Sequence, residues 1–247
     1  MRATPRPHRI GPVPPTFPFP RAAQTIGTDS ARFRTNLRAL FATRLHDAPT
    51  LTVPRRGHVY TDGERPVYVI ETGQVKTLMT TGGGKRCLLS ILGPGDVLGE
   101  LGLLDNERPD TAVALERARL RQIPGDRFLS VLAEEGLLPD YMRHLGEKVI
   151  EQQKIIVDMV TLECERRLAA RLRLLSEQLG TPCGRRMLIQ ARITQEELAE
   201  MIGTTRSRVG LFLKRFREAG LIHIEHGSLL VDDRMLGDYL AGRLPAA

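Results

Sequence analysis

The sequence has few of the features that are typical of secreted, metal-stabilised or membrane-spanning proteins. It has no tryptophan, only three cysteines in 247 residues, and no uninterrupted apolar run of the about 18 residues that a membrane span needs. Cys87, Cys164 and Cys183 are scattered and odd in number, which predicts neither a disulfide framework nor a Cys-x-x-Cys metal site. Cys87 is expected to be a buried core residue rather than a redox sensor. No apolar segment follows the N-terminal arginines, so no secretory signal is predicted. We therefore expect a cytoplasmic protein without a membrane partner.

Positive charge is present in excess, and its distribution along the chain is uneven. The net charge is +7. Residues 31–163 carry equal numbers of basic and acidic side chains, whereas residues 1–30 and 164–247 are both net basic. A neutral body with a basic C-terminal part favours a polyanion as partner. The alternative is a general preference for arginine, which supplies most of the basic residues.

Residues 1–136 divide into two parts. Residues 1–30 contain seven prolines and no periodic apolar pattern, so we predict a disordered tail. In residues 31–136, short apolar runs at 67–70, 74–79 and 86–92 alternate with glycine-containing turns. Short strands at regular spacing predict an antiparallel β-roll of the barrel or jelly-roll type.

The apolar period changes after residue 136. Residues 137–163 are predicted to be a long dimerisation helix, because residues recur at alternating steps of four and three, which is the period of a two-stranded coiled coil. Gln152 is the polar member of this seam, where it could fix the register or face a ligand. The alternative is a helix that packs on the β-roll of the same chain. The predicted seam consists of Leu138, Met142, Leu145, Val149, Gln152, Ile156 and Met159.

Residues 164–247 are predicted to be a winged helix-turn-helix domain. A helix over 164–179 is followed by a break at 181–184. Thr194 and Glu197 then fit a capping box, Gly203 fits a tight turn, and Thr205 fits the N-cap of a second helix. Residues 204–217 carry five basic side chains and no acid, as expected of a DNA-reading helix. Two short strands over 221–231 would form the wing. The alternative is an ordinary charged surface helix.

The order β-roll, seam helix and winged helix-turn-helix resembles the CRP/FNR family of bacterial transcription regulators, over roughly residues 35–240. The resemblance rests on residues 93–104, which look like the family's phosphate-binding cassette, and on residues 193–216, which look like its DNA-binding segment. It implies an α+β fold with a cyclic-nucleotide-binding-like sensor domain, a homodimer and a pseudo-palindromic DNA operator. RNA polymerase is a further candidate partner.

The cassette departs from the pattern of the family's nucleotide-binding members at one position. In those members, Gly-Glu-Leu holds the cyclic phosphate and the ribose, and an arginine before Ser/Thr-Ala pairs with the phosphate charge. Asp110 stands where that arginine is expected, and a carboxylate there would repel a phosphodiester. Ordinary cAMP sensing is therefore not expected. A cyclic nucleotide or another small effector remains a candidate ligand, as does a vestigial pocket. The pocket residues by resemblance are Gly99, Glu100, Leu101, Arg108, Asp110, Thr111, Gln152 and Gln153.

The recognition helix also departs from the family pattern. Arg206 matches the family's guanine-reading arginine, but Ser207 and Leu211 stand where other base readers are common. Phosphate anchors specify no base. The predicted DNA-binding residues are Thr194, Thr205, Arg206, Ser207, Arg208, Leu211 and Lys214.

Two other functions remain open. A DNA-binding regulator that needs no ligand would share the helix-turn-helix. An enzyme could use Glu100 and Asp110 as an acid–base pair, but the sequence shows no nucleophile, metal cluster or complete P-loop beside them. No metal site and no catalytic residue are predicted. His58 and His144 have no feature that would make either a haem ligand.

Overall fold

The computed structural model describes residues 26–60, 66–103, 110–190, 192–225 and 227–244. It begins with helix α1 (Ile26–Thr43), so the predicted boundary of the N-terminal tail at residue 30 is wrong. Phe33, Leu37 and Leu40 recur at helical spacing and are buried, which explains why the chain folds here once the prolines have ended. The rest of the predicted tail, residues 1–25, lies outside the described residues.

The predicted β-roll consists of two antiparallel sheets. One contains β1 (Thr50–Val53), β7 (Ala118–Pro124), β2 (Pro66–Thr72) and β5 (Val97–Leu98), in that order. The other contains β4 (Arg86–Leu92), β3 (Val75–Thr80) and β6 (Thr111–Ala114), in that order. Buried side chains of both sheets, such as Ile70, Val75 and Leu120, form one core cluster. Helix α2 (Gly125–Glu134) follows the last strand of the β-roll, β7.

Cys87 is a correction to the sequence analysis, because the structure places it on the surface. It is the second residue of β4 and pairs with Met79 near the turn of the β3–β4 hairpin. The buried residue of this stretch is Leu88, one position further on. Since side chains alternate between the faces of a strand, a shift of one residue exchanges buried and exposed positions.

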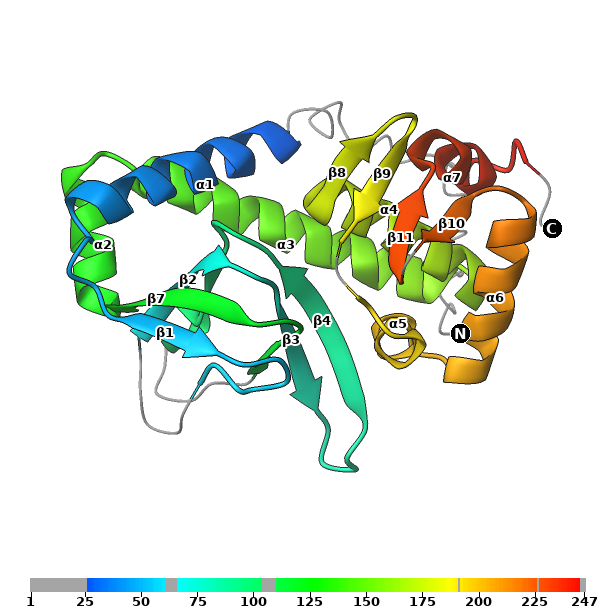
Figure 1. Cartoon of the computed structure of the whole chain (residues 1–247), viewed down its shortest axis with the longest axis horizontal. Coiled ribbons are helices and arrows are strands. Elements are labelled where there is room, and N and C mark those ends of the chain that lie inside the picture. The colour runs from blue at the N-terminus through cyan, green and yellow to red at the C-terminus, as the bar shows by residue number, and fades with distance from the viewer. Residues whose placement is uncertain (1–25, 61–65, 104–109, 191, 226, 245–247) are drawn as a thin grey trace, which may run out of the picture.

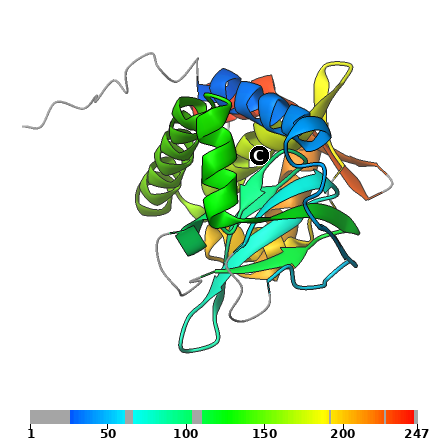
Figure 2. The same cartoon turned by 90° about the vertical axis from the view of Figure 1, so that its left-hand side faces the viewer.

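Helix α3 (Leu138–Thr161) runs through the middle of the molecule, from beside α1 and α2 toward α4 (Cys164–Leu179) (Figure 1). Its first half packs against α1 and α2, and Figure 2 shows these helices gathered above the strands of the β-roll. Tyr141 and His144 of α3 are buried there. None of the helices among the described residues is both long enough and apolar enough to cross a membrane.

The C-terminal part contains α4 (Cys164–Leu179), β8 (Gly180–Cys183), β9 (Arg186–Ile189), α5 (Gln195–Ile202), α6 (Arg206–Glu218), β10 (Ile222–Glu225), β11 (Ser228–Val231) and α7 (Asp233–Leu240). The strands form one antiparallel sheet in the order β10, β11, β9, β8. Sequence analysis predicted only a break at 181–184 and missed the β8–β9 hairpin. Pro182 obscures this strand in the sequence, but proline is tolerated at a sheet edge, where β8 lies.

Candidate DNA-binding and effector sites

The first helix of the helix-turn-helix, α5, begins with the predicted capping box. The hydroxyl of Thr194 accepts a hydrogen bond from the Glu197 backbone N–H at 3.2 Å, and the Glu197 carboxylate accepts one from the Thr194 N–H at 2.7 Å. The helix ends at Gly203, whose φ of +67° lies in the left-handed region that glycine adopts without strain. Local interactions therefore set both ends of α5.

The second helix, α6, presents the predicted DNA-reading face to solvent. Thr205 caps it by accepting from the Arg208 backbone N–H at 3.4 Å. Val209, Phe212, Leu213 and Phe216 are buried. All seven predicted DNA-binding side chains are exposed, namely Thr194, Thr205, Arg206, Ser207, Arg208, Leu211 and Lys214. The helix therefore has one face in the core and one that is free to enter a groove.

Arg215 belongs to the scaffold and not to this free face. It donates to the Glu165 carboxylate of α4 at 2.9 Å and is only half-exposed. Behind it, Phe216 packs edge-to-face on Tyr239 of α7, with ring centroids 5.7 Å apart. These contacts anchor the inner face of α6 to α4 and α7.

The cassette forms a tight bend between β5 and a short 3₁₀ helix, η2 (Glu100–Leu103). Gly99 has a φ of +82°, Glu100 is half-buried, and Leu101 is 43% exposed. Thr111 begins β6, opposite Leu78, and Asp110 directly precedes it. Arg108 lies outside the described residues. The cassette thus has the backbone turn that its glycine predicts.

Lys148 of α3 is a site residue that sequence analysis missed. Its ammonium group donates to the Glu100 carboxylate at 2.9 Å and to the Val97 carbonyl at 3.2 Å. The available sequence signal was its position one helical turn before Gln152, which was already expected near the pocket. Glu100, which would accept the ribose hydroxyl by family resemblance, is engaged by a cation of the same chain.

His144 lies one turn before Lys148 and is almost fully buried, at 1% exposed. Its Nδ1 is hydrogen-bonded to the Ser30 hydroxyl at 2.8 Å, and its ring stacks on Phe33 with centroids 5.1 Å apart. Burial, reinforced by the positive charges of Lys148 and Arg34, lowers the pKa of His144 to about 3. The imidazole is therefore neutral at physiological pH and adds no positive charge to that of Lys148.

The predicted seam of α3 divides into two groups. Leu138 and Leu145 are half-buried and pack against the core of their own chain, and the Met159 methyl group lies beside Gly203. Met142, Val149 and Ile156 are 65%, 56% and 62% exposed. Gln152 and Gln153 are both exposed. The alternative of packing within the chain therefore applies to part of the helix, and an apolar row remains free on the rest.

Comparison with known proteins supports both halves of the architecture. A cyclic nucleotide-binding domain model matches residues 50–135, and a Crp-like helix-turn-helix domain model matches residues 166–236. The chain is 30% identical over 183 residues to a CRP-like cAMP-activated global transcriptional regulator of Mycobacterium tuberculosis, covering 72% of this chain and 82% of that protein. It is 29% identical to a cyclic AMP receptor protein of Thermus thermophilus, covering 71% and 79%.

Solved structures show the same fold. A CooA mutant from Carboxydothermus hydrogenoformans aligns with a TM-score of 0.65 at 20% identity, covering 79% of this chain and 89% of the other. A CRP/FNR-family transcriptional regulator from Thermus thermophilus aligns with a TM-score of 0.62 at 23% identity, covering 79% and 100%.

Fold and site together define a DNA-binding transcription regulator, with a cyclic-nucleotide-binding-type sensor domain joined by a long helix to a winged helix-turn-helix. The chain belongs to the CRP/FNR family. This confirms the resemblance, the fold class and the expectation of a regulator rather than an enzyme that uses Glu100 and Asp110.

Proposed function

We propose that the chain acts as a homodimer that reads a pseudo-palindromic operator, and that its effector pocket departs from the cAMP pattern. The observation that carries the DNA-reading part is the free face of α6, where the predicted contact residues are all exposed above a buried apolar face. Two such helices would enter successive major grooves about 34 Å apart. Such a regulator would act in the bacterial cytoplasm, with RNA polymerase as a predicted further partner.

The free apolar row on α3 supports the homodimer. Met142, Val149 and Ile156 are spaced by seven residues, and Val160, four residues further, is 82% exposed. Along the exposed face, the row continues through Gly146 and Gln153, again with steps of four and three. A second copy of the helix would cover this row, with Gln153 as its polar member.

Arg206 is proposed as the base reader and Lys214 as a phosphate anchor. Arg206→Ala should cost about 1–3 kcal/mol at one base position of a DNA fragment selected from a random pool by the wild-type protein. Lys214→Ala should weaken all sequences equally. Equal weakening of every sequence by Arg206→Ala would contradict the base-reader assignment.

The pocket proposal rests on Asp110 and on the Lys148–Glu100 contact. A carboxylate at position 110 opposes a phosphodiester, and Lys148 competes for the acceptor that a ribose would use. We expect no binding of cAMP or cGMP by the wild-type protein in calorimetry, and binding by Asp110→Arg. Micromolar binding by the wild type would overturn this proposal and identify an ordinary nucleotide-gated regulator.

A second candidate is a regulator with a vestigial pocket. The observation that favours it is that Lys148 already pairs with Glu100 in this conformation. It predicts that neither Asp110→Arg nor its combination with Lys148→Met binds a nucleotide, whereas DNA binding by the free protein is retained. Binding gained only in the double variant would identify Lys148 as the obstacle and reject this candidate.

A further inference from the structure

The β3–β4 hairpin of the sensor domain is docked on α5, the first helix of the helix-turn-helix (Figure 1). Lys76 of β3 contacts the Glu197 carboxylate at 2.8 Å, and Arg86 of β4 contacts the Glu200 carboxylate at 2.6 Å. Both acids are largely buried, with side chains 11% and 9% exposed. The Lys76–Glu197 pair, whose lysine is only 13% exposed, is therefore largely shielded from the solvent screening that weakens surface pairs. Arg86 is 51% exposed, so its pair with Glu200 is shielded only on the side of the acid.

Apolar contact accompanies these ion pairs. Leu88 and Ile91 of β4 belong to the same core cluster as Leu198, Met201 and Ile202 of α5. All five side chains are at most 4% exposed. The hairpin and α5 thus share a continuous core, so that the helix-turn-helix cannot change its orientation without exposing apolar surface.

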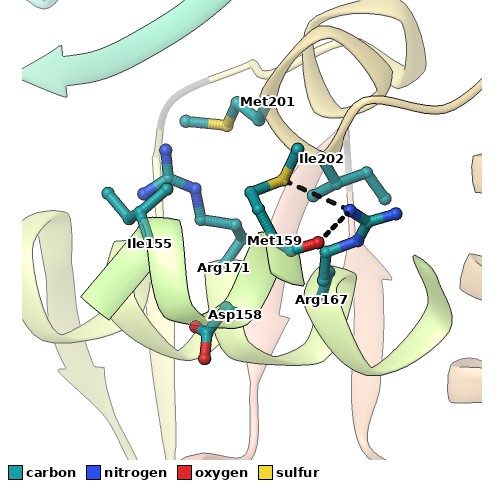
Figure 3. Close-up of a pocket in the computed structure, with 7 residues that line it drawn as sticks. All are labelled: Ile155, Asp158, Met159, Arg167, Arg171, Met201 and Ile202. Carbon is teal, nitrogen blue, oxygen red and sulfur yellow. Dashed lines mark hydrogen bonds between the residues drawn. The ribbon is translucent and has the colours of Figure 1, made fainter. Parts of the chain in front are cut away.

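Arg171 of α4 adds a third contact between the C-terminal part and β4. Its Nη2 donates to the Leu89 carbonyl of β4 at 3.1 Å, and the residue is only 7% exposed. Figure 3 shows its side chain extending toward Met201 of α5, beside Ile155 of α3. A buried arginine keeps its charge, so withdrawing it from this carbonyl is costly unless another acceptor replaces it.

Lys76 binds the Glu197 carboxylate, which also caps α5. Glu197 contacts Lys76 through one oxygen and the Thr194 backbone N–H through the other. Burial opposes ionisation of this carboxyl, but the hydrogen bonds from Lys76 and Thr194 outweigh it and keep the pKa of Glu197 below its ordinary value. The carboxylate therefore connects the sensor domain directly to the start of the helix-turn-helix.

We propose that Lys76, Arg86 and Arg171 are positioning residues for DNA recognition, which hold α5, and through it α6, in a fixed orientation on the sensor domain. This inference rests on the proposed DNA-reading function of α6. A dimer that must place two recognition helices at one spacing binds more tightly when both are already oriented, because less motional freedom is lost on binding.

The Arg86–Glu200 pair allows a charge-exchange test. Arg86→Glu and Glu200→Arg should each weaken binding to a DNA fragment selected from a random pool by the wild-type protein, by about tenfold, and the double exchange should restore most of it. Arg32→Glu, on the exposed surface of α1, is the matched control for the change in net charge. Binding to an isolated half-site should change no more than in that control.

The distance between the two half-sites of the DNA provides a measurement that a purely structural role of Arg86 would not affect. Inserting about five base pairs, half a helical turn, between the half-sites should weaken the wild type strongly and the Arg86→Glu variant much less. Tighter binding by Arg86→Glu, or equal sensitivity to the insertion, would overturn the proposal. Failure of the wild type to select any sequence would instead reject the proposed function.

A second measurement does not depend on DNA. Because the chain has no tryptophan, Arg234→Trp on the exposed surface of α7 would provide a single tryptophan in the DNA-binding domain, which can be excited selectively over the four tyrosines. Its time-resolved anisotropy should decay faster when Arg86→Glu is added, and return to the original decay in the charge-exchanged protein. An unchanged decay would show that these residues do not hold the domain in place.

Discussion

The helix-turn-helix and the effector pocket differ in how far apart in the sequence their defining contacts lie. Thr194 contacts Glu197 and Thr205 contacts Arg208, each across three residues. In the pocket, Lys148 and Glu100 are 48 residues apart, and Ser30 and His144 are 114 apart. The helix-turn-helix is therefore defined largely by local helix-capping contacts. The pocket forms only when elements that are distant in the sequence pack together.

The same contrast between local and distant contacts appears within α5. Its capping box follows from the order of residues around Thr194, but the use of its acids does not. Glu197 and Glu200 could equally be solvent-exposed charges of a surface helix, and only the docking of the β3–β4 hairpin makes them buried partners of Lys76 and Arg86. The local sequence thus defines the helix, and tertiary packing determines which of its charged side chains remain exposed to solvent.

The largest expected effect tests whether the two regions unfold together. Leu198→Ala removes a side chain that is 3% exposed in the core shared by α5 and β4, and should lower the free energy of unfolding by about 2–5 kcal/mol. Urea denaturation should still show one transition. Leu211→Ala, on the exposed face of α6, is the matched control and should change stability little. Two separated transitions would show that the regions are independent.

The second prediction concerns the buried histidine beside the pocket. The pKa of His144 is lowered in the fold, so the unfolded chain binds a proton below about pH 6.5 that the folded chain excludes until about pH 3. The stabilising contribution is complete above pH 6.5 and is lost as pH falls, by at most about 1.4 kcal/mol per pH unit. His144→Asn, which keeps a side-chain N–H donor for the Ser30 hydroxyl, should reduce this slope in denaturation at pH 4–7. His46→Asn, at an exposed histidine, should leave it unchanged.

The third prediction tests the local rules that define the DNA-reading element. Gly203→Ala places a side chain at a φ of +67° and should lower the free energy of unfolding by about 1–2 kcal/mol. Its added Cβ would lie 3.1 Å from the flexible Met159 methyl group, so backbone strain should dominate over steric clash. Gly82→Ala, with open space around it, is the control. Equal effects in chemical denaturation would contradict the assigned role of the turn.

The smallest expected effect on stability comes from the free face of α6. Lys214 lies 3.8 Å from Glu218, and both side chains are more than 60% exposed. Lys214→Ala should change stability by only about 0.5 kcal/mol or less. The same variant should reduce the slope of log affinity against log salt by about 0.9, the value for one phosphate contact. An unchanged slope would remove Lys214 from the set of phosphate anchors.

Sequence patterns predicted the order of the elements well and their surroundings less well. The strands over 67–92, the capping box, the turn at Gly203 and the wing are confirmed, because period and capping are local properties. Helix α1, the β8–β9 hairpin and the exposure of Cys87 were not predicted. In α3, heptad spacing predicted Met142, Val149 and Ile156 as seam residues, and these side chains are exposed. The same spacing also predicted Leu138 and Leu145, which pack against the core of their own chain.

The amino-acid sequence by itself determined the helix-turn-helix and the glycine bend of the cassette. Each depends on residue type at short spacing, where propensity and capping dominate. Only the tertiary structure decided that Lys148 pairs with Glu100, that His144 is buried as a neutral base, and that Lys76 and Arg86 hold α5. These contacts join residues far apart in the chain, and they form because burying the shared apolar surfaces brings the charges together.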